Sequence, residues 1–370
     1  MQVTICGNYG AKNIGDELIL EGLIKLLREI DDEIKINVLS DNPTETENAY
    51  NVRSSKKFPA GFRSLISFIK TKNKKNIKHL KQSDFFILGG GGLFGGPDKK
   101  ANFIWFMQCI VAIFYKKPII IIGQSIGKNL GFFGKQIVKF ISKKAKYISL
   151  RDHSSTDVLK KINPNLKNIY LYPDLALNLD LEESEGKQQR EIAFALRNIN
   201  TIDENFIKGI QDFIKWILQN TDYKVKLLSF QGGKKDNDEK LNMRVIKDIN
   251  GDVEIKKNTS KEELIKEYYS SDIVVTMRLH SMILAIKTKT PFIAISYAEK
   301  VNAFYKYSGL NGFIIKQKNI SLEILKSYFH NLLENSTEYK NEMEAFSTKS
   351  KNELKKQKYI LKDLFNKMLS

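Results

Sequence analysis

The sequence has 370 residues, of which 42% are hydrophobic, and it carries a formal net charge of +18 at pH 7. This length and hydrophobic content suit about two globular domains and exclude intrinsic disorder. The excess of lysine and arginine points to an anionic partner, but no helix-turn-helix, zinc finger or aromatic-studded basic sheet accompanies it, so a nucleic-acid partner is disfavoured.

In chain order, short apolar runs alternate with amphipathic helical patterns through the first half of the sequence. This alternation is typical of a doubly wound α/β domain with a parallel sheet. The first domain is predicted to span residues 1–179, with strands at residues 3–6, 34–39, 85–88, 119–122, 147–150 and 169–171.

A polar, acidic stretch over residues 180–189 interrupts the pattern, which then restarts. The second domain is predicted to span residues 190–320, with strands at residues 192–196, 225–230, 253–255, 273–275 and 292–295. Residues 321–370 read as C-terminal helices. The fold class is therefore α/β, with two Rossmann-like domains joined by one linker.

The sequence also indicates where the protein works. No secretory signal pattern opens the chain, and Cys6 and Cys109 are too few for a disulfide framework, which favours the reducing cytoplasm. The apolar run at residues 101–115 is shorter than the roughly 20 residues that span a bilayer, and we interpret it as a buried helix.

The positive charge lies mostly in the first half, because residues 1–175 account for +13 of the net charge. A membrane surface or a phosphate-bearing substrate would suit it, and coding bias toward lysine is the alternative. The basic and apolar segment 62–81 predicts an interfacial helix on anionic lipid at the inner face of the cell membrane. The alternative is an ordinary surface helix.

Ligands of doubly wound domains bind beyond the carboxyl ends of the strands, so the loops there are the candidate sites. The first such loop, residues 7–17, is crowded with glycine and asparagine and leads into a helix whose N-terminal N–H groups suit an anion or a sugar hydroxyl. Its candidate binding residues are Gly10, Asn13, Gly15 and Asp16. Asp16 could instead serve only as a helix N-cap.

Further candidates follow three later strands of the first domain. They are Gly91 and Gly92 in the glycine run 89–96, Gln124 and Ser125, and Arg151. The run contains a G-x-G-x-x-G pattern, but no acidic residue follows at the spacing that holds a ribose, and no P-loop occurs. NAD and ATP are therefore disfavoured and no cofactor is expected. A plain turn is the alternative for the run, and the alternative for Arg151 is that it pairs with Asp152 and that the two cap the following helix.

The second domain offers Arg197 at the end of its first strand and the segment Arg278, Leu279, His280 and Ser281 after a later one. The spacing of the following apolar residues places Arg278 at the start of a buried helix. A cation there opposes the helix dipole, and a phosphate or carboxylate ligand would resolve that conflict. The four histidines show no metal-ligand spacing, so no metal site is predicted.

These motifs together resemble the polysaccharide pyruvyl transferase family over about residues 1–310. The resemblance rests on G-N-Y-G-x-x-N-x-G-D-E near the N-terminus, G-G-G-G-L, G-Q-S-I-G, S-L-R-D, P-D-L-A at residues 173–176, and M-R-L-H-S-M-I-L-A-I with P-F-I-A-I-S-Y within residues 277–301. Lys128 and Lys289 stand where the family commonly has proline and glycine.

The resemblance implies a GT-B-like fold, with the two Rossmann-like domains facing across a cleft. It implies transfer of a pyruvyl group from phosphoenolpyruvate to two hydroxyls of a cell-surface polysaccharide or lipid-linked sugar, giving a cyclic ketal. Its phosphoenolpyruvate-binding positions carry over onto Arg197, Arg278, Leu279 and His280. We expect His280 to donate a proton or hold the departing phosphate, and Asp16 or Asp174 to activate the sugar hydroxyl.

Two other functions remain open at this stage. One is a GT-B glycosyltransferase that uses a nucleotide sugar, which would need an acidic or aromatic nucleotide contact in the second domain. The other is a noncatalytic protein of the membrane surface, suggested by segment 62–81.

Overall fold

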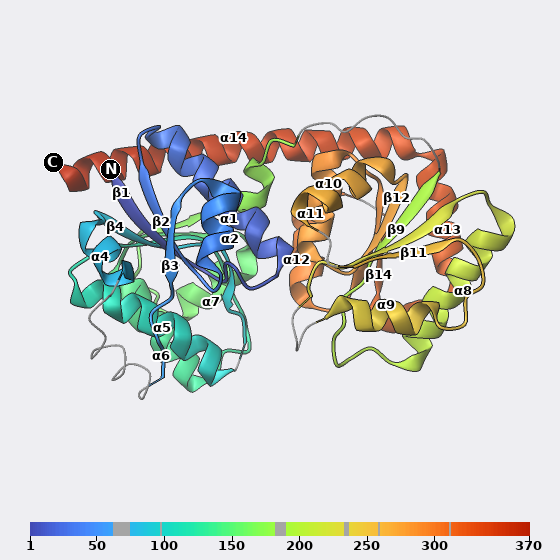
Figure 1. Ribbon diagram of the computed structural model, residues 1–370, viewed down its shortest axis with the longest axis horizontal. Helices are drawn as coiled ribbons and strands as arrows, with labels where there is room; N and C mark the ends of the chain where they lie inside the picture. The colour runs from blue at the N-terminus through green and yellow to red at the C-terminus, as the bar shows by residue number, and fades with distance from the viewer. Residues whose placement is uncertain (62–74, 97, 182–189, 233–236, 258–259, 311) are drawn as a thin grey trace. The chain divides into compact units, whose positions relative to one another are not determined.

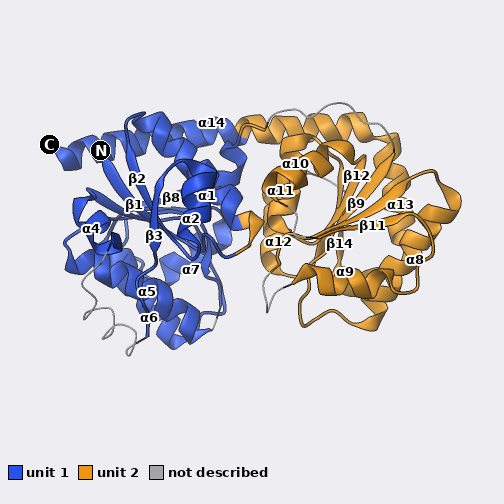
Figure 2. Cartoon of the chain, in the orientation of Figure 1, with its two compact units in different colours: residues 1–11, 16–179, 350–370 blue, residues 12–15, 180–349 orange. Residues whose placement is uncertain are grey.

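The computed structural model describes residues 1–61, 75–96, 98–181, 190–232, 237–257, 260–310 and 312–370. The predicted interfacial helix falls mostly in residues 62–74 and so lies outside the described residues. The chain divides into two compact units, one of residues 1–11, 16–179 and 350–370 and one of residues 12–15 and 180–349 (Figure 2).

The first unit is built on a parallel sheet with strand order β3-β2-β1-β4-β6-β7-β8, and β5 pairs with β6 beside this path (Figure 1). Its described strands are β1 (Gln2–Cys6), β2 (Lys35–Ser40), β3 (Arg53–Lys56), β4 (Phe85–Leu88), β5 (Gly91–Phe94), β6 (Ile119–Ile126), β7 (Ala145–Leu150) and β8 (Ile169–Leu171). Its helices are α1 (Ile14–Ile30), α2 (Pro43–Tyr50), α4 (Lys75–Gln82), α5 (Lys99–Phe114), α6 (Phe132–Lys144) and α7 (His153–Ile162), with a short 3-10 helix η1 (Leu175–Asn178).

The second unit has a parallel sheet of order β11-β10-β9-β12-β13-β14. Its described strands are β9 (Glu191–Ala195), β10 (Lys224–Leu228), β11 (Val253–Lys256), β12 (Ile273–Thr276), β13 (Phe292–Ser296) and β14 (Ile314–Lys316). Its helices are α8 (Glu204–Asn220), α9 (Asp238–Ile246), α10 (Lys261–Ser270), α11 (Leu279–Thr288), α12 (Glu299–Ser308) and α13 (Leu322–Glu334), with a 3-10 helix η2 (Gln317–Asn319).

The last helix, α14 (Ser336–Leu369), contributes to both units, so the segment predicted as C-terminal helices is divided between them. Residues 336–349 pack in the second unit, where Tyr339 contacts Phe292 with ring centroids 5.8 Å apart. Residues 350–370 pack in the first, where Phe365 stacks on Phe85 with centroids 4.7 Å apart.

The glycine run corrects the sequence prediction, because part of it is a strand rather than a loop. Gly91 pairs with Gln124, and β6 extends through Ile126, so Gln124 and Ser125 are strand residues too. The absence of side chains allows this packing: a Cβ at Gly89 would lie 2.1 Å from the Tyr9 hydroxyl oxygen.

The apolar run at residues 101–115 forms α5, as predicted, but only one face of this helix is buried. Trp105, Cys109 and Ala112 pack inward, whereas Phe114 is 77% exposed. Across the described residues, no helix combines the length and the apolar character needed to cross a membrane.

Candidate active site

Three neighbouring strands of the second unit bring basic and phenolic side chains to one edge. The residues Ala195, Thr276 and Ala294 of β9, β12 and β13 are in register. Arg197 and Arg278 each follow two residues later, and Tyr297 follows the end of β13. Because the strands are parallel, these residues emerge side by side at the carboxyl edge, where the sequence analysis places the donor site.

Arg278 is the N-cap residue of α11, so the predicted position at a helix start is confirmed. The side chain of this N-cap residue forms no capping hydrogen bond to the helix. The first backbone N–H groups of an α-helix have no acceptor within the helix, and here they belong to Leu279, His280 and Ser281. The segment therefore presents several N–H donors at the positive end of the helix dipole, an arrangement suited to an anion.

Arg278 also has a carboxylate partner that the sequence analysis missed. Its Nη2 lies 2.5 Å from Oδ1 of Asp238, the first residue of α9, and both side chains are buried. The other oxygen of Asp238 accepts hydrogen bonds from the backbone N–H groups of Phe230 and Gln231, at 3.1 Å each. Asp238 therefore balances part of the cationic charge and fixes the guanidinium in place.

The Nε of Arg278 is buried and has no hydrogen-bond partner in the structure. Arg278 is 8% exposed. A buried donor without a hydrogen-bond acceptor costs about 1–3 kcal/mol of free energy, so a ligand oxygen that accepted from this nitrogen would remove that cost. A carboxylate or phosphate is the natural acceptor for a guanidinium edge that already uses Nη2.

Tyr297 lies close to two basic side chains, those of Arg197 and Lys300. Its hydroxyl accepts a hydrogen bond from Nη1 of Arg197, and Nζ of Lys300 lies 5.9 Å from the centre of its ring. Burial acts to raise the pKa of Tyr297, but the positive charges of Lys300 and Arg197 outweigh it and lower this pKa below its ordinary value. Neither Tyr297 nor Lys300 was predicted as a site residue.

Ser281 differs from the expectation in how its side chain is used. Its hydroxyl is fully buried and hydrogen-bonds the hydroxyl of Tyr268 on α10. The side chain therefore joins α10 to α11, and only the backbone N–H of Ser281 remains suited to a ligand.

Residues 12–15, predicted in the first domain, pack within the second unit. The backbone N–H of Ile14 donates to the carbonyl of Phe230 at 3.2 Å, and Asn13 forms a β-bridge with Gln231. A Cβ on Gly15 would lie 2.1 Å from Nδ1 of His280. Two motifs that are far apart in the sequence, around Gly15 and His280, therefore meet, and the side-chain-free position leaves room for the imidazole.

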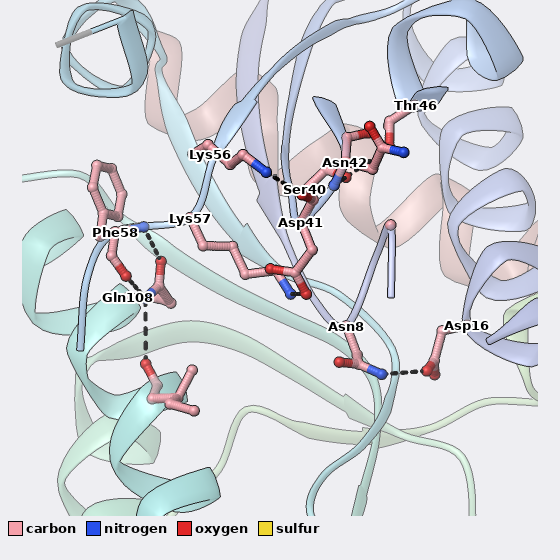
Figure 3. A network of polar contacts seen from close by, with 12 residues as sticks. Asn8, Asp16, Ser40, Asp41, Asn42, Thr46, Lys56, Lys57, Phe58 and Gln108 are labelled. Carbon is pink, nitrogen blue, oxygen red and sulfur yellow. Dashed lines mark hydrogen bonds and ion pairs between the residues drawn. The ribbon is translucent and has the colours of Figure 1, made fainter. Parts of the chain in front are cut away.

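At the carboxyl edge of the first unit, Asp16 lies in the first turn of α1 rather than at its N-cap. Its Oδ2 accepts a hydrogen bond of 2.7 Å from Nδ2 of Asn8, just after β1 (Figure 3). A Cβ on Gly91 would lie 3.4 Å from its Oδ1. The structure thus brings Asp16 and Gly91 together, whereas the neighbouring Gly92 is exposed with open space around it.

The ends of β2 and β3 extend this edge. Nζ of Lys57 lies 2.8 Å from Oδ2 of Asp41, and Lys56 donates to the carbonyl of Asp41 (Figure 3). Gly10 has a positive φ of 70°, and a Cβ there would lie 2.2 Å from the Ser40 hydroxyl oxygen. Gly10 is thus required by the local packing of this loop, which is a structural role.

Arg151 and Asp174 form a buried ion pair in the first unit. Nε of Arg151 also donates to the Ser125 hydroxyl at 2.7 Å, and Oδ1 of Asp174 accepts from the backbone N–H of Ala176 at 3.0 Å. Of the alternative reading, in which Arg151 pairs with Asp152 and caps the helix, the cap is confirmed, because Asp152 accepts from the N–H of Ser155 at the start of α7, while the ion pair of Arg151 is formed with Asp174. Both oxygens of Asp174 are used inside the fold.

Gln124 completes the survey of predicted residues. Its side chain is buried and donates through Nε2 to the carbonyl of Gly89, while its Oε1 has no hydrogen-bond partner. Among the residues that the structure describes, no group of three histidine, cysteine or acidic side chains could hold a metal ion.

Comparison with solved structures supports the fold. The chain is similar to a putative UDP-N-acetylglucosamine 2-epimerase from Listeria monocytogenes, at a TM-score of 0.70 and 10% identity, covering 99% of this chain and 97% of the other. It is also similar to the UDP-GlcNAc 2-epimerase from Neisseria meningitidis bound to UDP-GlcNAc, at a TM-score of 0.65 and 11% identity, covering 100% and 99%. The predicted GT-B fold class is therefore confirmed.

Among curated proteins, the chain is 22% identical to the amylovoran biosynthesis protein AmsJ of Erwinia amylovora over 369 residues, covering 84% of this chain and 86% of the relative. The family model for polysaccharide pyruvyl transferase matches residues 13–299, which include Arg197 and the Arg278–Ser281 segment. The match covers most of the chain and identifies a transferase. The chain belongs to the polysaccharide pyruvyl transferase family.

Proposed function

We propose that this transferase moves the pyruvyl group of phosphoenolpyruvate onto two hydroxyls of one sugar, in a cell-surface polysaccharide or its lipid-linked precursor, to form a cyclic ketal. The observation that carries the proposal is the buried Arg278 at the start of α11, whose Nε has no hydrogen-bond partner among the described residues, with Arg197 at the end of the adjacent strand. Family membership and the AmsJ relative support the acceptor class.

The donor carries a carboxylate and a phosphate, and the second unit offers two kinds of anion contact. Arg278 supplies a guanidinium that Asp238 holds in a fixed orientation, and the N–H groups of the first turn of α11 point the same way as the helix dipole. Arg197 and Lys300, which both lie close to Tyr297, supply two further positive charges. We assign one anionic group of phosphoenolpyruvate to each of these two clusters.

The reaction then follows from charge and proton balance. A proton adds to the methylene carbon of the enol, one sugar oxygen forms a bond to C2, the C2–phosphate oxygen bond breaks, and the second sugar oxygen closes the ring at C2. The two hydroxyl protons end on the new methyl group and on the released phosphate. His280, in the first turn of α11, is assigned the proton delivered to the methylene carbon.

Asp16 is assigned the removal of a proton from the acceptor hydroxyl. Its oxygens lie next to the neutral amide of Asn8 and the side-chain-free Gly91, whereas Asp174 is committed to Arg151 and to the backbone of Ala176. Of the two acids that the sequence analysis proposed, Asp16 is therefore the better candidate, and Asp174 is assigned the positioning of Arg151.

The similar epimerase structures leave a nucleotide sugar as the rival donor, since the one from Neisseria meningitidis is bound to UDP-GlcNAc. Titration calorimetry with phosphoenolpyruvate, UDP-N-acetylglucosamine and UDP-glucose separates the two. We expect binding of phosphoenolpyruvate alone, and weaker binding in Arg197→Lys and Arg278→Lys but not in the matched control Arg244→Lys, an exposed arginine paired with Glu204. Binding of a UDP sugar with no binding of phosphoenolpyruvate would reject the proposal.

A further inference from the structure

Helices α5 and α6 lie side by side on one face of the first unit (Figure 1). The sequence of α5 places apolar side chains on both of its faces. Phe103, Met107, Ile110 and Phe114 follow the spacing i, i+4, i+7 and i+11, which places them along one stripe. This stripe faces away from the buried stripe that includes Cys109. Phe114 is 77% exposed, and the other three are half-buried.

The polarity of α5 is reversed relative to an ordinary surface helix, which turns its polar residues toward water. The polar side chains of Asn102 and Gln108 point inward and are hydrogen-bonded there. Asn102 donates to the carbonyl of Gly96 at 3.1 Å, and Gln108 both accepts from the N–H of Phe58 at 2.9 Å and donates to its carbonyl at 2.7 Å. Among the described residues, these inward contacts of α5 leave the exposure of Phe114 on the outward stripe unexplained.

Helix α6 enlarges the same apolar area. Phe132 is 80% exposed, Phe133 40% and Phe140 39%. The rings of Phe103 and Phe133 have centroids 6.4 Å apart, and those of Phe106 and Phe140 are 5.9 Å apart, so side chains of the two helices are in contact. We call the exposed surface formed by Ile104, Phe114, Phe132, Phe133 and Phe140 the α5–α6 face.

Apart from Asp98, which caps the start of α5, the charge along these two helices has a single sign. Residues 99–150 contain ten lysines and no acidic residue. Lys135, Lys139 and Lys143 are exposed on α6 between its phenylalanines, and Lys99 and Lys100 are exposed at the start of α5. Exposed phenylalanines within a rim of lysines match a bilayer surface, where rings enter the acyl boundary and ammonium groups meet anionic headgroups.

We propose that the α5–α6 face docks the protein on an anionic lipid surface. This surface is distinct from segment 62–81, and the inference does not rest on pyruvyl transfer. Each lysine near an anionic leaflet contributes about 1 kcal/mol, and an anionic bilayer accepts a positive rim of any geometry, whereas a protein partner needs matched acidic positions. Such docking would bring the enzyme to the membrane that carries lipid-linked sugars.

Vesicle sedimentation tests the proposal with the full chain. Wild-type protein should sediment with vesicles of phosphatidylcholine mixed with phosphatidylglycerol, should bind less as salt rises, and should not bind phosphatidylcholine alone. The double variant Phe114→Ser/Phe132→Ser should lower partitioning at least about ten-fold. The control Met243→Ser/Tyr359→Ser, which removes exposed apolar side chains of α9 and α14, should behave as wild type.

Charge reversal gives a second pair of variants. Lys139→Glu/Lys143→Glu should weaken binding to anionic vesicles, and Lys316→Glu/Lys318→Glu, which changes the net charge equally on the second unit, should weaken it much less. Vesicle binding that survives both variants of the α5–α6 face would overturn the proposal, as would absence of wild-type binding. Wild-type protein could instead fail to bind vesicles and form a concentration-dependent dimer that Phe114→Ser/Phe132→Ser abolishes. That result would assign the face to a second copy of the chain and would also overturn the proposal.

Discussion

Two buried arginines, one in each unit, occupy equivalent places and differ in what surrounds them. Arg151 follows β7 and precedes α7, and Arg278 follows β12 and precedes α11. Each pairs with a buried aspartate, Asp174 for the first and Asp238 for the second. A histidine lies in the first turn of each helix, His153 in α7 and His280 in α11.

The two sites differ in how many of their polar groups form hydrogen bonds within the protein. Around Arg151, Ser125 accepts from Nε and Asp152 caps α7. Around Arg278, Nε has no hydrogen-bond partner among the described residues, and the N-cap side chain forms no capping hydrogen bond to α11. The same local arrangement thus gives a closed structural network in one unit and a set of directed donors in the other, which is why we place the phosphoenolpyruvate site at Arg278.

The largest effect should come from the histidines. His280→Gln keeps a hydrogen-bond donor but cannot deliver a proton, so kcat should fall by about 10²- to 10⁴-fold. The matched variant His153→Gln changes an exposed residue at the comparable place and should retain wild-type kcat. Release of phosphate from phosphoenolpyruvate in the presence of acceptor measures both. Near-normal turnover in His280→Gln would remove the proton-donor role.

The next effect concerns the guanidinium of Arg278. Arg278→Lys keeps the charge but loses the planar donor pair, so kcat/KM for phosphoenolpyruvate should fall by about 10²- to 10³-fold with the melting temperature nearly unchanged. Arg244→Lys is the control. If Arg278→Lys retained full efficiency, the distinction drawn between the two arginines would fail.

Arg151→Ala should act on stability instead of donor binding. It leaves Asp174 buried without its cation, so the free energy of unfolding should decrease by about 3–5 kcal/mol, measured by urea denaturation. The dissociation constant for phosphoenolpyruvate, measured where the variant is folded, should match that of wild type. A selective loss of donor affinity at full stability would instead place Arg151 in the donor site.

The smallest effect should come from Tyr297→Phe, which removes the hydroxyl that accepts from Arg197. The KM for phosphoenolpyruvate should rise about 2- to 10-fold.

The same tyrosine predicts a pH dependence in the wild-type enzyme. Lys300 and Arg197 outweigh burial and lower the pKa of Tyr297, so its phenolate forms at a lower pH than that of an ordinary tyrosine, whose pKa is about 10. The phenolate occupies those cations and repels the anionic donor, so wild-type KM should rise as pH passes this pKa. The same alkaline rise in Tyr297→Phe would assign it to another group.

The sequence predicts the features that depend on local pattern. Most strands of both sheets, the helix start at Arg278 and the polar loops at strand ends follow from apolar periodicity and from glycine, serine and aspartate positions. Strand β14 was missed because its three residues, Ile314–Lys316, are too few to show a periodicity. Strand β3 was missed because its sequence, Arg-Ser-Ser-Lys, is polar; Ser54 is buried through a hydrogen bond of 2.8 Å to the carbonyl of Val38. Strand β5 was missed because it lies in a glycine run.

The hydrogen-bond partners of the site residues lie far from them in the sequence, so no local pattern predicts them. Asp238 lies forty positions before Arg278, and only the fold shows that α9 places it there. Tyr297 became recognisable as a site residue only through its contact with Arg197, one hundred positions away. Asn237 and Asp238 are typical of a helix start, but no sequence pattern pairs Asp238 with a particular arginine.

A structure of the protein with phosphoenolpyruvate bound tests the central claim most directly. We predict that an anionic oxygen of the donor lies within hydrogen-bond distance, about 3 Å, of Nε of Arg278, while the network of Arg151, Ser125 and Asp174 is unchanged. A donor that contacts Arg151 and leaves Nε of Arg278 without a partner would contradict the account.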